Sequence, residues 1–136
     1  MNSTSLYLSG HGIRPSVQRI AIMRYLLKNR THPTAEDVFE ALRRQIPTLS
    51  KTTVYNTLKL FVENGAALYV GIDEKNARFD GYVEPHAHFR CKKCGRIIDL
   101  PMEIDKIVPE DFSGDMEEVY FYIKGLCEDC KNKEVQ

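Results

Sequence analysis

Residues 50–65 read SKTTVYNTLKLFVENG, and this stretch decides the fold of the first half of the chain. Ser50 is a good helix N-cap, because its hydroxyl can accept a hydrogen bond from a backbone N–H of the first turn. Asn64-Gly65 supplies a left-handed stop at the other end. The apolar residues between them recur at i, i+4, i+7 and i+8, which predicts one buried helix face: Val54, Leu58, Phe61 and Val62.

The opposite face of this expected helix is polar and basic and carries one aromatic residue. An α-helix fits the major groove of DNA, and the side chains that reach bases or phosphates lie on one of its sides. We therefore interpret the face as a candidate DNA-binding surface, although a solvated helix face is the commoner fate of such charges. Its residues are Lys51, Thr52, Tyr55, Asn56 and Lys59.

Outward from this helix, the flanking segments predict a winged helix-turn-helix. Two short strands, 68–72 and 77–79, surround a polar turn at 73–76 and form a hairpin, in which Lys75 and Arg78 are candidates for contact with the DNA backbone. Upstream, Thr34 and Asp37 form a capping box for a second helix that Pro47 ends. Pro15 suits the first turn of an earlier helix. The apolar faces expected for these two helices are Val17, Ile20, Ala21, Met23 and Leu27, and Val38, Phe39, Ala41 and Leu42.

Charge is distributed unevenly, although the 136-residue chain has a formal net charge of zero. Residues 1–60 hold nine basic and three acidic side chains, a net charge of +6, whereas residues 84–136 hold eight basic and twelve acidic ones, a net charge of −4. Unless the split is chance, it predicts an electrostatic footprint for nucleic acid on the first half only. We therefore add Arg14 and Arg19 to the candidate DNA contacts. No segment is long and apolar enough for a membrane span or a signal peptide, so we expect a cytoplasmic protein.

Four cysteines occur as two Cys-x-x-Cys pairs, Cys91/Cys94 and Cys127/Cys130. Disulfides are disfavoured in the cytosol, and two such pairs are typical of one tetrahedral zinc site. Four thiolates leave no open coordination position, so the zinc would be structural. Free buried cysteines or a redox dithiol are the alternatives, and the glycine directly after Cys94 favours the metal.

The second ligand pattern is His86-Ala87-His88, because residues i and i+2 of a strand point to the same face and can reach one metal ion. Asp80 and Asp99 lie near in sequence. Nitrogen and oxygen ligands without thiolate suit Fe²⁺, Mn²⁺ or Zn²⁺. Two surface histidines with no ligand role are the alternative.

Residues beyond 80 predict a second, smaller domain. Strands are expected at 88–91, 96–100 and 118–126, with a short helix within 102–112. We therefore predict an α+β protein: a winged-helix DNA-binding domain at 1–80, a hinge at 81–85, and an α/β dimerisation domain with structural zinc at 86–136.

Taken together, these motifs resemble the ferric uptake regulator superfamily. The resemblance lies in His86-x-His88-x-x-Cys91-x-x-Cys94-Gly95 with the later cysteine pair, in the segment 31–38 (THPTAEDV), and in the segment 50–58 (SKTTVYNTL). It covers roughly residues 10–133. Arg14-Pro15 departs from the family's common Thr-Pro, which predicts a weaker helix cap, and His11 has no counterpart.

The resemblance implies a homodimeric repressor that binds double-stranded operator DNA, palindromic in keeping with the dimer. It implies zinc on the four cysteines and a regulatory Fe²⁺ or Mn²⁺ between the domains on five further residues. The sequence resembles the peroxide-sensing branch of the family at two aspartates, Asp80 and Asp99, and in having no histidine in 118–122. In that branch, His32 or His86 would be oxidised. An iron- or zinc-uptake repressor is the alternative within the family. The regulatory ligands would be His32, Asp80, His86, His88 and Asp99.

Two other classes of protein fit less well. A metal-dependent hydrolase could use His86, His88 and an aspartate to activate water, but the chain has no separate general base at motif spacing, so we do not expect an enzyme. A zinc-stapled interaction module without a DNA role leaves the basic helix face unexplained. Salt-dependent binding to a palindromic duplex would separate that module from a repressor.

Overall fold

The chain divides into two compact units, Met1–Val83 and Glu84–Gln136. The computed structural model describes residues 3–84, 86–103, 110–116 and 119–134. The units meet in sequence within the predicted hinge, 81–85, and the hinge itself stays a prediction. Within the described residues, no helix is long and apolar enough to cross a membrane.

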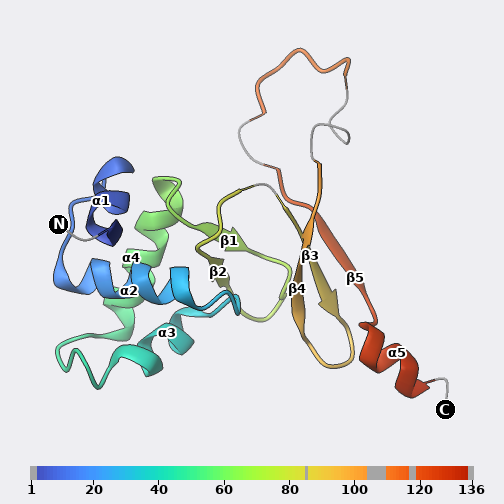
Figure 1. The fold of residues 1–136 in the computed structure, drawn as a ribbon, viewed down its shortest axis with the longest axis horizontal. Coiled ribbons are helices and arrows are strands. Elements are labelled where there is room, and N and C mark those ends of the chain that lie inside the picture. The colour runs from blue at the N-terminus through green and yellow to red at the C-terminus, as the bar shows by residue number, and fades with distance from the viewer. Residues whose placement is uncertain (1–2, 85, 104–109, 117–118, 135–136) are drawn as a thin grey trace. The chain divides into compact units, whose positions relative to one another are not determined.

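The first unit has the element order of a winged helix-turn-helix (Figure 1). Its helices are α1 (Ser3–Gly10), α2 (Val17–Lys28), α3 (Ala35–Leu42) and α4 (Lys51–Glu63), followed by the strands β1 (Leu68–Val70) and β2 (Arg78–Asp80). The strands pair antiparallel, with Tyr69 opposite Phe79. On its other side β2 forms a bridge from Arg78 to Thr34, which attaches the segment before α3 to the hairpin.

Local signals in the sequence correctly predicted the third and fourth helices. The Thr34 side chain accepts a hydrogen bond from the Asp37 N–H, and the Asp37 carboxylate accepts one from the Thr34 N–H, so the capping box is complete. Ser50 caps α4 by accepting from the Thr53 N–H at 3.0 Å. Gly65 has a φ of 74°, as the predicted left-handed stop requires.

The second helix and the end of the third were predicted less well. Ser16 caps α2, and Pro15 lies before the helix instead of in its first turn, so the predicted weak cap was wrong. Val17 and Leu27 are exposed, and the buried face is Ile22, Met23 and Leu26. Helix α3 ends at Leu42, well before Pro47, and Ala41 is exposed.

Helix α1 was not predicted, and it completes the core of the first unit. Leu8 is fully buried among residues of the other helices, and the Tyr7 hydroxyl donates to the Ala66 carbonyl at 2.7 Å. His11, at the end of this helix, bonds the Tyr7 carbonyl through Nδ1 and packs on the Tyr7 ring. His11 therefore has a structural role in the first unit.

The second unit is a three-stranded sheet in the order β4-β3-β5, followed by a helix (Figure 1). Strand β3 (His86–Cys91) pairs antiparallel with β4 (Ile97–Pro101) and parallel with β5 (Tyr122–Gly125), and α5 (Glu128–Glu134) follows. The predicted third strand, 118–126, is thus shorter than expected. The predicted helix within 102–112 falls largely on 104–109, outside the described residues.

Candidate metal centres and nucleic-acid interface

The first cysteine pair closes the turn between β3 and β4. Cys91 is the last residue of β3, and the chain reverses over the next three residues to Gly95, whose φ of 77° a residue with a Cβ would adopt only under strain. The Gly95 N–H donates to the Cys91 carbonyl at 3.0 Å, and the Cys94 N–H points at the Cys91 sulfur at 3.5 Å. Both thiols of the pair are thereby held on one side of a tight turn.

The second pair is brought to the first by the parallel pairing of β3 with β5. Cys91 lies opposite Gly125 in this register, and the Lys92 N–H donates to the Gly125 carbonyl at 2.7 Å. Cys127 follows two residues later, just before α5, and Cys130 lies in the first turn of that helix. Sheet register and helix start together explain how residues 33 or more positions apart converge.

The four sulfur atoms fit a tetrahedral zinc ion. All four cysteines are free of disulfide bonds, and their Sγ atoms lie within 4.8 Å of one another. The Sγ atoms of Cys94 and Cys127 are 3.8 Å apart. A zinc–sulfur bond of about 2.3 Å gives a tetrahedron with edges of about 3.8 Å. The residues predicted to form the zinc site therefore come together, and zinc itself stays a prediction.

The thiols of this cluster differ in acidity. Hydrogen bonds from the backbone N–H groups of Cys94 and Cys127 lower the pKa of Cys91 to about 6. The pKa of Cys130 is raised to about 12, first by the contact between its thiol and the Cys127 thiol and then by burial. One thiolate thus forms readily while another is disfavoured among buried sulfur atoms, and a divalent cation would relieve this repulsion.

In the second unit, the two predicted strand histidines and one predicted aspartate lie together. His88 pairs with Asp99 across β3 and β4, and the Nε2 atoms of His86 and His88 lie 3.3 and 3.5 Å from Asp99 Oδ1. The two rings are 4.3 Å apart between centroids. Both histidines are buried, at 7% and 5% exposure. The i, i+2 prediction of a shared face is therefore correct.

A backbone contact fixes the tautomer of His86. Its Nδ1 lies 2.7 Å from the Glu84 carbonyl, which can only accept, so Nδ1 carries the proton. In the neutral ring, Nε2 then presents a lone pair toward the Asp99 carboxylate. His86 Nε2 and Asp99 Oδ1, both acceptors, then face each other at 3.3 Å, which suits a cation bound by both. The contact of Nδ1 fits the same role, because a metal-bound histidine commonly donates its other N–H to a carbonyl.

In the first unit, the other two predicted ligands form a buried pair. His32 Nε2 lies 3.5 Å from Asp80 Oδ2, and the side chains are 2% and 1% exposed. Asp80 Oδ1 accepts the Tyr82 N–H at 2.8 Å, which orients the carboxylate. The Arg30 guanidinium lies 4.1 Å from the centroid of the Tyr82 ring. Arg30 precedes His32 by two residues, and Tyr82 follows Asp80 by two residues. Arg30 and Tyr82 were not predicted, because no local pattern connects them.

The predicted DNA-binding side chains of α4 share one exposed face, and Tyr55 is 49% exposed. Lys51 differs from the expectation in one respect, because its Nζ lies 3.4 Å from the Glu36 carboxylate on α3. Arg78 lies differently from the expectation for the wing, since its guanidinium binds Asp73 and the His32 carbonyl. The other candidates for DNA contact lie in the same unit. Arg19 is half-buried, and the rest are exposed: Arg14, Thr52, Asn56, Lys59 and Lys75.

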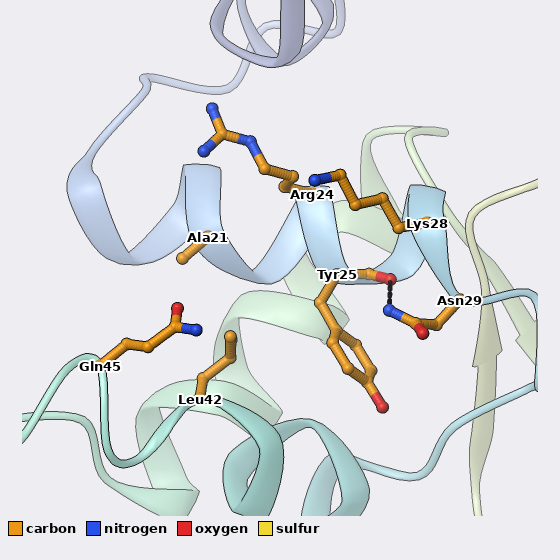
Figure 2. Close-up of a pocket in the computed structure, with 7 residues that line it drawn as sticks. All are labelled: Ala21, Arg24, Tyr25, Lys28, Asn29, Leu42 and Gln45. Carbon is orange, nitrogen blue, oxygen red and sulfur yellow. Dashed lines mark hydrogen bonds between the residues drawn. The ribbon is translucent and has the colours of Figure 1, made fainter.

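A small open pocket of about 190 Å³ lies between α2 and the end of α3 (Figure 2). Leu42, Gln45 and the Tyr25 ring are among its lining residues, and Asn29 Nδ2 donates to the Tyr25 carbonyl at 3.0 Å. None of the predicted metal or DNA-binding residues lines it.

A chain that combines a winged helix-turn-helix unit with clusters of side chains able to hold metal ions has the features of one class of protein, the metal-responsive transcriptional regulators. The model of the Ferric uptake regulator family matches residues 10–117, and the chain belongs to this family. Members of the family are DNA-binding dimers that regulate transcription and are not enzymes. The chain is 34% identical over 126 residues to the "Peroxide-responsive repressor PerR" of Staphylococcus aureus, covering 90% of this chain and 85% of that protein.

Solved structures show the same fold. The ferric uptake regulator of Pseudomonas aeruginosa with manganese has a TM-score of 0.76 at 22% identity, covering 93% of this chain and 99% of that one. That of Helicobacter pylori, described as having three functional metal-binding sites, has a TM-score of 0.73 at 19% identity, over 93% and 87%. PerR from Streptococcus pyogenes is 27% identical with a TM-score of 0.52, over 92% and 88%.

Proposed function

We propose that this chain is a peroxide-responsive repressor that needs a regulatory metal ion to bind its operator. It acts as a homodimer on palindromic double-stranded DNA, with structural zinc on the four cysteines and Fe²⁺ or Mn²⁺ on the histidine and aspartate ligands. The observation that carries the proposal is the fixed tautomer of His86, which aims a ring nitrogen at the half-buried carboxylate of Asp99. The 34% sequence identity to the peroxide-responsive repressor of Staphylococcus aureus supports peroxide as the signal.

The regulatory site takes ligands from both units. His86, His88 and Asp99 come from the sheet of the second unit, and His32 and Asp80 come from the first. Neither set alone provides the five nitrogen and oxygen ligands. Ligation across the boundary would therefore favour one arrangement of the two units, which needs a differential binding free energy of only about 3–5 kcal/mol.

Bound Fe²⁺ would supply the redox chemistry that cleaves the O–O bond of hydrogen peroxide. The chain supplies the target, because His32 and His86 present buried imidazole rings at the site. In the net reaction, a ring C–H bond of either histidine and the O–O bond of peroxide would break and a C–O bond would form. The imidazole would supply the two electrons that peroxide takes up, and the second oxygen atom would leave as water. The modified ring is a poorer ligand, so the site weakens and the repressor releases its operator.

The test compares operator binding with Fe²⁺ and with Mn²⁺, before and after peroxide. We expect peroxide to abolish binding only of the Fe²⁺ form, with one added oxygen atom on a peptide containing His32 or His86. Peroxide-insensitive binding with both metals, and no added oxygen, would instead indicate an uptake repressor. That result would contradict the proposed signal.

His32→Ala tests the metal site itself. We expect this variant to lose at least tenfold in Mn²⁺-dependent operator affinity, about the minimum cost of removing a metal ligand or its direct support, while its thermal unfolding stays cooperative. His11→Asn is the matched control, because His11 contacts Tyr7 within the same unit and is not one of the proposed ligands. A normal Mn²⁺ response in the His32 variant would exclude a site that uses both units.

A further inference from the structure

The turn between β1 and β2 is organised around one buried carboxylate. Asp73 is 8% exposed. Its Oδ1 accepts the Lys75 N–H at 3.0 Å, and its Oδ2 accepts the Arg78 Nε–H at 2.9 Å. Both oxygens are therefore used to hold the turn at 73–76, which is the tip of the predicted wing.

The same arginine also holds the backbone of a proposed metal ligand. Arg78 Nη1 donates to the His32 carbonyl at 3.0 Å, across 46 positions of sequence. His32 has a φ of 58°, a left-handed conformation that a residue with a Cβ adopts only where its surroundings stabilise it. The adjacent Phe79 N–H donates to the Pro33 carbonyl at 2.9 Å, so β2 fixes this segment at two successive positions.

We propose that Arg78 is a positioning residue that couples the metal ligand His32 to the wing through Asp73. Its guanidinium bonds the His32 carbonyl with one nitrogen and the wing carboxylate with another. A change in the backbone of His32 on metal binding is therefore passed to the turn that carries Lys75. The metal half of this inference rests on the proposed function, whereas the contact between the two segments does not.

Lysine cannot replace arginine in this role. A guanidinium is planar and directs several N–H groups at fixed angles, whereas an ammonium is a single point charge on a flexible stem. Arg78→Lys keeps the charge but cannot satisfy the His32 carbonyl and Asp73 with the same geometry. Asp73→Asn keeps an acceptor for the Lys75 N–H and removes the charge that binds Arg78. The two variants therefore break the link from opposite ends.

The first experiment needs no regulatory metal. Hydrogen exchange followed by mass spectrometry would compare the full-length variants with the parent chain in peptides that cover residues 30–34 and 71–79. We expect Asp73→Asn to accelerate exchange at residues 30–34 and at the Phe79 amide by at least threefold, although Asp73 lies in the turn. Exchange unchanged at residues 30–34 would overturn the coupling.

The second experiment adds Mn²⁺. In the parent chain we expect Mn²⁺ to slow exchange in residues 71–77, and we expect Arg78→Lys to lose this effect and to bind Mn²⁺ about tenfold more weakly. Arg43→Lys is the matched control, because Arg43 makes an exposed ion pair with Glu40 on α3. Parent-like Mn²⁺ affinity and wing protection in Arg78→Lys would overturn the inference. If Mn²⁺ neither bound to the parent chain nor changed its hydrogen exchange, that result would contradict the proposed function. The metal-free experiment would still show whether Arg78 couples residues 30–34 to the turn at 73–76.

Discussion

In the first unit, His32 and Gly65 both adopt left-handed backbone conformations, but for different reasons. Gly65 has a φ of 74° at the end of α4, where the lack of a Cβ makes this conformation accessible. His32 has a φ of 58° and a Cβ, and hydrogen bonds from β2 to the His32 and Pro33 carbonyls hold it. Glycine at a helix end reflects local geometry, whereas a histidine in this conformation depends on the contacts around it, and such residues cluster at functional sites.

The Gly65 position yields a stability prediction. Nothing lies within 4 Å of a Cβ added there, so the substitution Gly65→Ala creates no clash. Only the left-handed backbone is unfavourable, and we expect a loss of about 1 kcal/mol in the free energy of unfolding. Gly10→Ala is the control, because an added Cβ there also meets open space and its φ is not positive. Equal unfolding midpoints in urea for the two variants would contradict this explanation.

Single residues also show how far the sequence could predict the site. The ligand types and the shared face of His86 and His88 follow from i, i+2 spacing, and the Thr34–Asp37 capping box follows from local chemistry. The contacts that Arg78 makes with Asp73 and the His32 carbonyl were missed, because one of them spans 46 residues. The sequence did contain a signal for one contact of Asp73, the hydrogen bond from the Lys75 N–H. An aspartate that opens a polar turn commonly accepts a hydrogen bond from the N–H two residues later.

Among the elements, the hairpin of β1 and β2 depends on a charged group inside its turn. Burial raises the pKa of Asp73, but hydrogen bonds from Lys75, Arg78 and Asn76 and the charge of Arg78 lower it more, to a net value below the ordinary 3.8. A carboxyl whose pKa is depressed in the folded state contributes stability above its unfolded pKa, and this contribution is lost as the pH falls through the folded value. Asp73 should therefore stabilise the hairpin at neutral pH and not in strong acid.

Acid titration of Asp73→Asn tests that dependence. As the pH falls from about 5 through 3.8 and then through the lower folded pKa of Asp73, we expect the parent chain to lose more unfolding free energy than the variant, because the variant has no carboxyl to protonate at this position. Helical circular dichroism is a suitable signal, since α1 to α4 all belong to the unit that contains the hairpin. Glu40→Gln, at an exposed ion pair, is the control that should follow the parent chain. Parallel pH profiles for the parent chain and Asp73→Asn would refute the role of this carboxylate.

The elements of the second unit meet at the cysteines, so we expect their stability to depend on a bound metal ion. The small core around Cys91, Cys127 and Cys130 has only Phe89 and Ile98 packed against it among the described residues. Such a core contributes little hydrophobic stabilisation by itself, and small domains of this kind commonly depend on a structural metal. Zinc would thus replace the missing apolar contacts.

Cys94→Ser tests the contribution of zinc to these elements. We expect bound zinc to fall from about one ion per chain to well below half, and the dimer to dissociate, because three thiolates no longer close the tetrahedral site. Lys92→Ala is the control, since Lys92 lies in the same turn without a thiol and its backbone N–H, which the variant retains, bonds Gly125. Elemental analysis and sedimentation would measure both effects. Full zinc content in Cys94→Ser would remove the argument that the metal holds β3 to α5.

The elements show a similar limit on prediction from sequence. Helices α3 and α4 carry strong caps at their starts, and they were predicted. Helix α1 was missed, because its apolar residues show little helical periodicity and contacts such as Leu8 in the core and Tyr7 to Ala66 fix it in place. The apolar face of α2 was assigned wrongly at Val17 and Leu27, because a helix rich in apolar residues offers several possible faces. Tertiary packing decides such cases.

Across the whole molecule, charge separates the two units. The first unit, residues 1–83, holds eleven basic and seven acidic side chains, a net charge of +4 against −4 in residues 84–136, which favours the first unit as the source of DNA attraction. A formal net charge of zero for the chain conceals this asymmetry. Because counterions are released when cations meet phosphates, the affinity for DNA should fall steeply with salt, in proportion to the number of contacts.

Lys59→Ala tests this charge asymmetry. Lys59 is exposed on α4, and loss of one phosphate contact should reduce the slope of log affinity against log salt by about 0.9 per chain, so by about twice that in a dimer. The loss should be similar for specific and random duplexes, since a phosphate contact reads no sequence. Lys131→Ala, at an exposed position in the last turn of α5, removes the same charge from the acidic unit and should leave the slope unchanged. If both variants reduced the slope equally, the attraction would come from overall charge, and α4 would lose its assignment as the DNA-binding face.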